Sequence, residues 1–338
     1  MPPRGRRLPG TEFGGMDDIM NKTAIAIDVG GTKTLGVLFG ADGQVLSVRR
    51  DRGITPVDAP AAVCVALYSG MADTLLRDAA SRGLRTVDTG YCSIATAEHY
   101  TPLFYDGIAA AAGDRLARLR VEPDGLCVIS GMLGHSDGAA MICGTGSSLY
   151  VREGETFWRT GGWGHYIDSC GSGFVLGRLA LRAVLRAHDG RGAPTLMTEL
   201  AESRIGRPVW DAYDEIYAGG RPYIAAFADC VFEARKAGDA AAAGIFDSCA
   251  CDLAELLHTA KRRLGKPYTA ILNGGVFAHH PEYAGAVIAL GPSDVTSMTG
   301  TTPPVYGCAV EAMHDLGLEC GEDFRERFMS SLSVISGK

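Results

Sequence analysis

Apolar residues in the first part of the chain occur in short runs that are separated by tight turns. The first run, at residues 24–27, alternates Ala and Ile, which predicts a short strand packed on both faces. A second run covers residues 35–39, and the pair Asp42-Gly43 then turns the chain into a third run at residues 44–48. The pattern therefore predicts three consecutive strands at the start of the fold.

Farther along the chain, apolar residues recur at steps of three and four, which is the spacing of amphipathic helices. Helices are predicted at residues 61–82, 108–119, 126–133 and 174–187, within 195–264, and from Val305, where the last helix begins. Strands are predicted at residues 87–95, 119–121, 139–143, 149–151 and 268–272. Strands followed by helices on either side predict a mixed α/β layer architecture.

The strand–turn–strand pattern returns in the middle of the chain. An apolar strand at residues 139–143 ends in the turn Gly144-Thr145-Gly146-Ser147, and a new strand follows. Such an internal repeat is typical of two duplicated lobes. A chain of 338 residues is also too long for one small core. We therefore predict two α/β lobes.

Charge and hydropathy exclude several classes of partner. The net charge is −7 and Lys and Arg form no basic stripe, so we expect no nucleic-acid partner. No apolar run approaches the length that a bilayer requires, so we expect no membrane partner. Residues 1–20 are predicted to be a disordered N-terminal extension without a secretory signal, and the ordered chain is expected to begin near Met16 or Met20.

The ten cysteines lie in apolar surroundings and lack the spacing of a disulfide framework. Reduced, buried thiols in a cytoplasmic protein explain this distribution. The one close pair, Cys249 and Cys251, falls in a predicted helix, so we expect no metal site there.

The turn after the first strand is the first candidate for chemistry. Asp28 precedes two adjacent glycines and two hydroxyl side chains, namely Gly30, Gly31, Thr32 and Thr34. Backbone N–H groups exposed by such glycines suit a phosphate, and the carboxylate before them suits a Mg²⁺ ion bound through water. A glycine hairpin without a ligand is the alternative interpretation of this string alone.

Two later segments hold further candidate side chains. Asp124 stands between a predicted strand and a predicted helix, where it is either a plain helix N-cap or a functional carboxylate favoured by the helix N-terminus. Residues 160–173 form a glycine-rich segment that carries Trp163, His165 and Asp168.

Three glycine turns together resemble a known superfamily. They are Asp-Val-Gly-Gly-Thr at 28–32, Gly-Thr-Gly-Ser at 144–147 and Asn-Gly-Gly-Val-Phe at 273–277. The first two resemble the phosphate loops of the actin-like ATPase superfamily, which includes sugar kinases, and the third is similar to its adenosine loop. The string Gly-Gly-Trp-Gly-His at 161–165 narrows the resemblance to the N-acetylglucosamine kinase branch, which shares its domain family with the BadF/BadG-type ATPases.

The resemblance implies an α/β fold of two ribonuclease-H-like lobes with a nucleotide cleft between them. The lobes would cover residues 21–124 and 125–338, and the last helix could pack back on the N-terminal lobe. The implied cofactors are ATP and Mg²⁺. The implied activity is transfer of the γ-phosphate to a hydroxyl of an N-acetylglucosamine-like amino sugar or a related sugar acceptor, and we also expect a homodimer.

The resemblance also assigns roles to individual residues. Asp124 would be the catalytic base, and Asp28 would position Mg²⁺ through water. The residues implied for nucleotide binding are Asp28, Gly30, Gly31, Thr32, Thr34, Gly144, Thr145, Gly146, Ser147, Gly274 and Gly275. The residues implied for the sugar acceptor are Ser93, Thr145, Gly162, Trp163, Gly164, Asp168 and Ser169.

The chain departs from the family pattern mainly in its substrate loops. Ser169 stands where the family has an acid that hydrogen-bonds the sugar, and Thr55 lies where an Asn is expected. Pro123 replaces the Asn that usually precedes the catalytic Asp. Because the phosphate turns are kept, this pattern favours a kinase with an altered acceptor, for which N-acetylglucosamine is at best a poor substrate.

Two other functions stay open on the sequence alone. One is a BadF-type ATPase that energises a partner protein, although such activators carry iron–sulfur cysteines and no matching cysteine-rich loop occurs here. The other is a non-catalytic sugar or nucleotide sensor of the same fold. ATP turnover that depends on an added sugar would distinguish the kinase from both.

Overall fold

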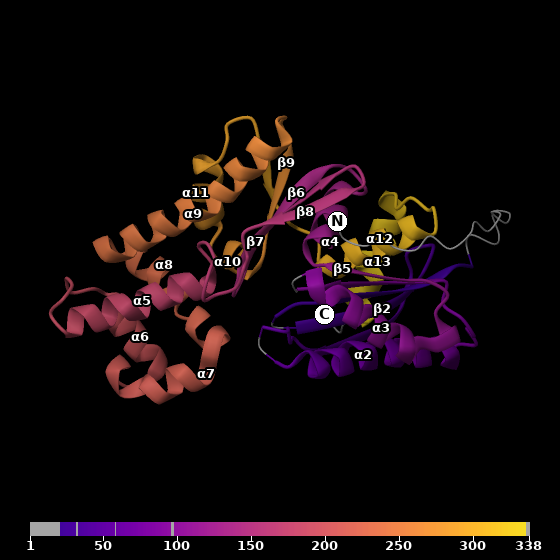
Figure 1. Ribbon diagram of the computed structural model, residues 1–338, viewed down its shortest axis with the longest axis horizontal. Coiled ribbons are helices and arrows are strands. Elements are labelled where there is room, and N and C mark those ends of the chain that lie inside the picture. Colours follow the sequence, from indigo (N-terminus) through magenta and orange to yellow (C-terminus); the bar gives the residue numbers. More distant parts are fainter. Residues whose placement is uncertain (1–20, 32, 58, 96–97, 336–338) are drawn as a thin grey trace. The chain divides into compact units, whose positions relative to one another are not determined.

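The computed structural model describes residues 21–31, 33–57, 59–95 and 98–335 (Figure 1). It divides into two compact units, of which unit 1 is Met1–Ser136 with Thr301–Lys338 and unit 2 is Asp137–Gly300. The predicted disordered extension at residues 1–20 and the predicted phosphate-binding Thr32 lie outside the described residues.

Unit 1 is built on one five-stranded sheet. Its strands are β1 (Thr23–Val29), β2 (Lys33–Gly40), β3 (Val45–Arg52), β4 (Thr89–Ile94) and β5 (Leu119–Pro123). Their order is β3-β2-β1-β4-β5, with β3-β2-β1 antiparallel and β1-β4-β5 parallel. Every residue of β1 is buried, so the predicted strand packed on both faces is confirmed.

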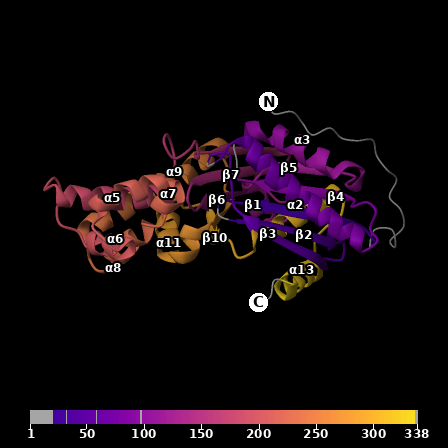
Figure 2. The same ribbon diagram turned by 90° about the horizontal axis from the view of Figure 1, so that it is seen from below.

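Helices cover both faces of this sheet (Figure 2). They are α2 (Ala61–Ser81), η1 (Glu98–Tyr100), α3 (Thr101–Ala112), η2 (Gly113–Arg115), α4 (Gly125–Leu133), α12 (Pro304–Asp315) and α13 (Glu322–Ile335). The helices α2 and α3 pack together on one face, where the rings of Tyr68 and Phe104 meet edge to face at 5.0 Å. The prediction that the helix from Val305 is the last one is wrong. The helix α13 follows it and packs Phe328 against Phe39 of β2.

The division into units differs from the predicted boundary after Asp124. The helix α4 packs against α12, which itself packs on β1 and β4, so both helices stay with the first sheet. The reason is apolar burial. Residues 125–131 are all buried, and none of them belongs to the apolar core of unit 2. A buried hydrogen bond from Ser130 of α4 to Glu311 of α12 adds to this packing.

Unit 2 repeats the same strand arrangement. Its strands are β6 (Gly138–Cys143), β7 (Ser147–Glu153), β8 (Thr156–Thr160), β9 (Thr269–Asn273) and β10 (Thr296–Thr299), in the order β10-β9-β6-β7-β8. The strands β6, β7 and β8 are antiparallel, whereas β9 and β10 run parallel to β6. The predicted internal repeat of strand, turn and strand is therefore confirmed.

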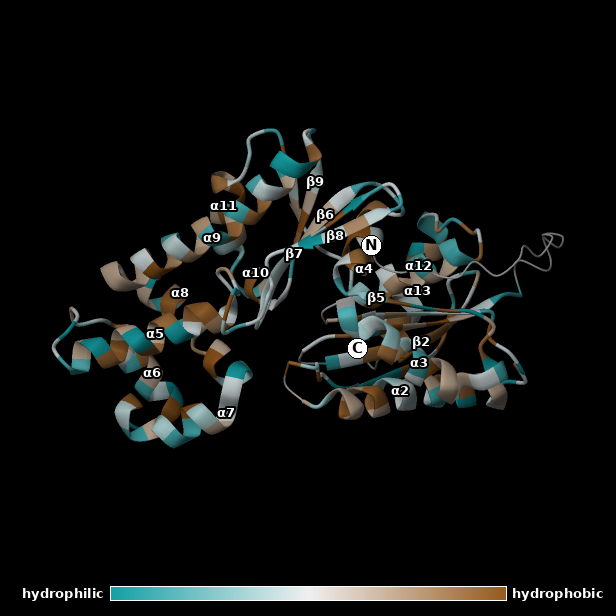
Figure 3. Cartoon of the chain, in the orientation of Figure 1, coloured by the Kyte–Doolittle hydropathy of each residue, from teal (hydrophilic) through white to brown (hydrophobic). Residues whose placement is uncertain are grey.

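The helices of unit 2 form a large apolar core with its sheet. They are α5 (Gly173–His188), α6 (Met197–Ile205), η3 (Val209–Ala212), α7 (Tyr213–Ala225), α8 (Ala228–Lys236), α9 (Ala240–Leu264), α10 (Gly275–His279) and α11 (Pro281–Leu290). Hydrophobic and hydrophilic positions alternate along α9 (Figure 3), and its buried side includes Phe246, whose ring meets that of Phe232 at 5.9 Å. This core fixes the sheet whose strand ends carry the candidate site residues of unit 2.

Candidate functional site

The parallel strands of unit 1 bring three predicted site residues to one edge of the sheet. Asp28 of β1 lies opposite Ser93 of β4, and Ser93 in turn lies opposite Glu122 of β5. Asp124 directly follows β5. Because β1, β4 and β5 are parallel, their carboxyl ends meet at the same edge, where ligands of α/β sheets usually bind.

Asp28 and Asp124 interact electrostatically at this edge. The pKa of Asp28 is raised to about 7, mainly because the carboxyl is buried and also because of the charge of Asp124, while the charge of Lys33 partly offsets the rise. A carboxylate at such a strand end suits a divalent metal that comes with its own phosphate ligands, which is how Mg²⁺ is usually bound. Asp28 therefore fits the implied ion.

Asp28 should make stability depend on pH. Its carboxyl has a pKa of about 7 in the folded chain, against an ordinary value of 3.8, so the folded state holds a proton that the unfolded state releases between these values. The stabilisation is fully present below the unfolded pKa and is lost as the pH rises through the folded one. The free energy of unfolding should fall over this window by up to about 1.4 kcal/mol per pH unit.

Denaturant unfolding of the nucleotide-free protein and of Asp28→Asn across this pH window measures the effect. The wild type should lose stability more steeply than the variant, which has no carboxyl to titrate. Parallel curves for the two proteins would show that Asp28 titrates normally.

Asp124 occupies the N-cap position of α4, but its side chain makes no capping hydrogen bond to that helix. This geometry separates it from a plain N-cap, in which the side-chain oxygen accepts from the N–H groups of the first turn. Its backbone carbonyl accepts a hydrogen bond from the Cys127 thiol at 2.9 Å.

Cys127 is a site residue that the sequence analysis missed. Besides its bond to Asp124, its fully buried sulfur lies 3.2 Å from Oγ of Ser93, so one thiol connects two of the strand ends. The signal available in the sequence was its position three residues after Asp124 in a predicted helix, which places it one turn along the same face.

The first glycine turn is compact. The Gly30 N–H donates to the Lys33 carbonyl at 2.9 Å, whereas Gly31 is exposed and has no neighbouring atom near the position of a Cβ. Thr34 is buried, and its hydroxyl donates to the Arg52 carbonyl of β3 at 3.0 Å. The structure therefore places Thr34 in the strand pairing, away from the exposed part of the turn.

The second glycine turn connects β6 to β7 and is fastened to the start of α5. The Gly173 N–H donates to the Gly144 carbonyl at 2.8 Å, and the Phe174 N–H donates to the Thr145 carbonyl at 3.1 Å. Gly146 accepts from the Gly144 N–H at 2.8 Å. The hydroxyl of Ser147 donates to the Cys170 carbonyl, which ties the turn to the glycine-rich segment.

The predicted adenosine turn lies beside the second glycine turn. Ile142 of β6 pairs with Asn273 of the parallel β9, so Gly144 and Gly274 follow neighbouring strand ends. Gly274 has φ of +114° and lies against Cys143 so closely that a Cβ would overlap its backbone. Only glycine suits this backbone position, and Gly275 then begins α10 with open space around it.

The segment between β8 and α5 places Trp163 next to the second glycine turn. Gly162 has φ of +73°, and a Cβ there would lie 2.7 Å from Cβ of Ser148. Gly164 has φ of +103° and open space beside it. Between them Trp163 is 65% exposed, so its ring offers a large apolar surface at the position predicted for the sugar.

The structure distinguishes Ser169, which stands where the family resemblance expects an acid, from its neighbour Asp168. Ser169 is buried, and its hydroxyl lies 2.8 Å from Oγ of Ser172, the N-cap of α5. Asp168 is partly exposed, and its Oδ1 accepts from the Cys170 thiol at 2.9 Å. Asp168 is therefore the better placed of the two to meet an acceptor.

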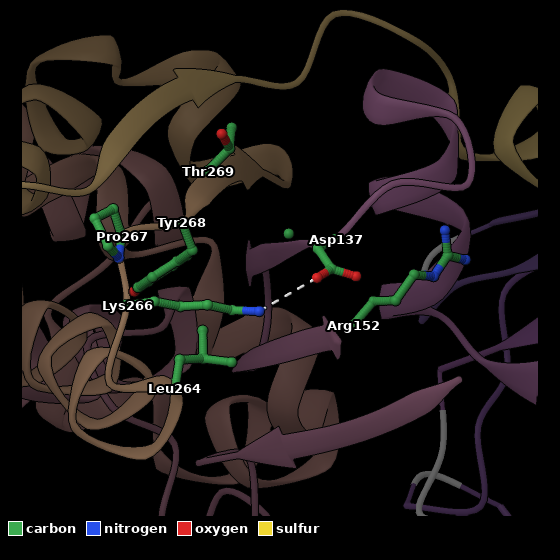
Figure 4. Close-up of a pocket in the computed structure, with 8 residues that line it drawn as sticks. Asp137, Arg152, Leu264, Lys266, Pro267, Tyr268 and Thr269 are labelled. Carbon is green, nitrogen blue, oxygen red and sulfur yellow. Dashed lines mark hydrogen bonds and ion pairs between the residues drawn. The ribbon is translucent and has the colours of Figure 1, made fainter. Parts of the chain in front are cut away.

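A cavity of about 320 Å³ in unit 2 includes none of the predicted residues (Figure 4). It lies where β6 begins, whereas the glycine turn follows the opposite end of that strand. Lys266 bonds there to Asp137 at 3.5 Å and to Glu153 at 2.8 Å. The complete lining is Asp137, Gly138, Arg152, Leu264, Lys266, Pro267, Tyr268 and Thr269.

Two features are absent from the described residues. Their helices include none that is long and apolar enough to cross a membrane. They also contain no group of three or more His, Cys, Asp or Glu side chains arranged for a metal ion. The pair Cys249 and Cys251 is split between a buried and an exposed position of α9, as expected for residues two apart in a helix.

Comparison with known sequences gives a family match and two named relatives. A sequence model of the BadF/BadG/BcrA/BcrD ATPase family matches residues 25–290. The chain is 37% identical over 84 residues to an N-acetylmuramic acid/N-acetylglucosamine kinase of Clostridium acetobutylicum. The matched segment covers 24% of this chain and 27% of that protein. It is 32% identical over 143 residues to an N-acetyl-D-glucosamine kinase of Dictyostelium discoideum, covering 40% and 44% respectively. The matched segments thus span less than half of either relative.

Comparison with solved structures extends over most of the chain. A protein of Porphyromonas gingivalis that is provisionally named an N-acetylglucosamine kinase superposes with a TM-score of 0.68 at 21% identity. The match covers 88% of this chain and 100% of that one. At this identity the likeness concerns the fold, and it confirms the fold class predicted from the glycine turns.

Proposed function

Because the chain belongs to the BadF/BadG/BcrA/BcrD ATPase family, we propose that it is an ATP-dependent kinase that phosphorylates a hydroxyl of an amino sugar or related sugar. The observation that carries the proposal is the meeting of Asp28, Ser93 and Asp124 at the ends of three parallel strands. Two interacting carboxylates in different surroundings are a common arrangement at sites of acid–base chemistry.

Asp124 is the proposed general base. Its carboxylate accepts the proton of the attacking hydroxyl while the new O–P bond forms at the γ-phosphorus and the bond from that phosphorus to the β-phosphate oxygen breaks, releasing ADP. The Cys127 thiol and the start of α4 hold the backbone at this position. Phosphoryl transfer is mostly positioning and charge neutralisation, so few other side chains are needed.

Asp28 is the proposed holder of Mg²⁺, through water, and the ion when bound neutralises phosphate charge. Gly31 of the first turn and Thr145 and Gly146 of the second are proposed to donate backbone N–H groups to phosphate oxygens. Gly274 and Gly275 are proposed to allow close approach of the adenosine. A homodimer and a cytoplasmic location belong to the same proposal.

The acceptor is proposed to contact Trp163 and Asp168. Both named relatives act on amino sugars according to their names, which supports that substrate class. Ser169 cannot replace a sugar-binding carboxylate because its hydroxyl bonds to Ser172 within the segment. N-acetylglucosamine itself is therefore proposed to be a weak substrate, and a sugar with another substituent is proposed to be the preferred one.

Release of ADP from ATP and Mg²⁺ tests the function, measured with and without a panel of sugars and amino sugars. Turnover that appears only when a sugar is added, together with a phosphorylated sugar seen by mass spectrometry, is the expected result. Turnover at the same rate without any sugar would instead support the partner-energising ATPase. Nucleotide binding without turnover on any acceptor would support a sensor.

A further inference from the structure

Arg159, near the end of β8, holds a positive charge beside the predicted acceptor residues. Its Nη1 donates to the Gly162 carbonyl at 3.1 Å, and its Cζ lies 4.7 Å from the centre of the Trp163 ring. Among the described residues of unit 2, no carboxylate lies within ion-pair distance of this guanidinium. A guanidinium held in place by a carbonyl and a ring is prepared to bind an anion.

The surroundings of Arg159 connect it with the acceptor. Gly162, to which it bonds, lies against Ser147 and Ser148 at the second glycine turn. Trp163 remains 65% exposed although Arg159 stacks on it. A ligand that covers the exposed part of the indole therefore comes within reach of the guanidinium.

The stretch from Arg159 to Gly173 carries one charge of each sign, on Arg159 and on Asp168. The position where the family resemblance expects an acid is the neutral Ser169, which is buried and bonded to Ser172. Asp168 is the acid that remains, and its Oδ1 accepts from the Cys170 thiol. Arg159 is partly exposed and has a fixed orientation, so it is the side chain best suited to distinguish a charged sugar from a neutral one.

We infer that Arg159 binds a carboxylate on the sugar acceptor, so that acidic amino sugars are preferred over neutral ones. The inference rests on the proposed kinase function and adds the class of acceptor to it. Arginine and carboxylate form paired, parallel hydrogen bonds, which gives both affinity and orientation. The carboxylate would thereby fix which hydroxyl of the sugar faces the transferred phosphate.

The test uses two acceptors that differ in one carboxylate-bearing group, N-acetylmuramic acid and N-acetylglucosamine. Values of kcat/KM for both, and KM for ATP, are measured for the wild type, Arg159→Gln, Arg159→Lys and the control Arg182→Gln, an exposed arginine of α5. Arg159→Gln should lower kcat/KM for the acidic sugar about 10- to 100-fold more than for the neutral sugar, because only the acidic sugar loses a carboxylate contact. Arg159→Lys should restore part of the loss, and the control should change neither value.

Calorimetric titration of the same proteins with each sugar in the absence of ATP separates this inference from the proposed function. If binding of the acidic sugar weakens only in the Arg159 variants, the inference is supported, whether or not a sugar is phosphorylated. Absence of phosphorylation of every sugar would reject the kinase proposal alone. Equal losses for both sugars, a raised KM for ATP with either sugar, or a wild-type protein that binds the neutral sugar more tightly would overturn the role of Arg159. Turnover could then persist and leave the kinase proposal intact.

Discussion

Asp124→Asn should lower kcat for the sugar acceptor by about 10²–10⁴-fold, the usual contribution of a general base. The amide has nearly the shape of the carboxylate but cannot accept the proton of the attacking hydroxyl. The backbone carbonyl that bonds to the Cys127 thiol is unchanged, so α4 should keep its position. Affinity for ATP should therefore stay within a fewfold of the wild type, as measured by calorimetric titration beside steady-state kinetics.

Asp106→Asn is the matched control, because this exposed residue of α3 undergoes the same chemical change away from the strand ends. It should keep wild-type kinetics. If Asp124→Asn retained most of its turnover, Asp124 would be left with a structural role at the start of α4, and the proposed base would have to be another residue.

Glu311→Ala should lower the free energy of unfolding by about 1–3 kcal/mol, the usual cost of leaving buried hydrogen-bonding groups without a partner. Glu311 is fully buried in α12 and forms an ion pair with Arg120 of β5. It also accepts a hydrogen bond from Ser130 of α4, and His135 lies 3.7 Å from its Oε1. Truncation would remove this carboxylate, while Asp315 would stay 3.2 Å from Nε of Arg120. Urea unfolding measures the loss of stability that remains.

Two variants control this experiment. Glu326→Ala removes an exposed carboxylate of α13 and should change stability by less than about 0.5 kcal/mol. The double variant Arg120→Met with Glu311→Leu replaces both charges by apolar groups and should be more stable than Glu311→Ala alone. An equal loss in the single and double variants would mean that packing volume, and not the buried charge, determines the stability of this region.

The glycine turns and the main strands could be predicted from the sequence because their causes are local. The strand β1 consists of small and branched apolar residues that are buried along its whole length. Gly274 follows β9 with φ of +114°, a backbone conformation that strongly favours glycine. Local residue types therefore indicated the positions of the turns and of the main strands along the chain.

Other elements depend on partners that are distant in the sequence. The strands β8 and β10 have no fully buried residue, so they lack a hydrophobic period and escaped prediction. They form because β7 and β9 offer backbone partners at the sheet edges. The same holds for α13, whose Phe328 is buried by packing against Phe39 of β2.

The sequence by itself determined which side chains are candidates for phosphoryl transfer, since Asp28, Asp124 and the glycine turns are recognisable from residue type and spacing. The tertiary structure decided which of them meet. Parallel pairing places Asp28 beside Ser93, 65 residues later in the chain, and the Cys127 thiol links Ser93 to the position of Asp124. Packing likewise turned Ser169 inward toward Ser172 and left Arg159 against Trp163. Hydrogen-bond partners and burial depend on segments far apart in the chain, and no local pattern records them.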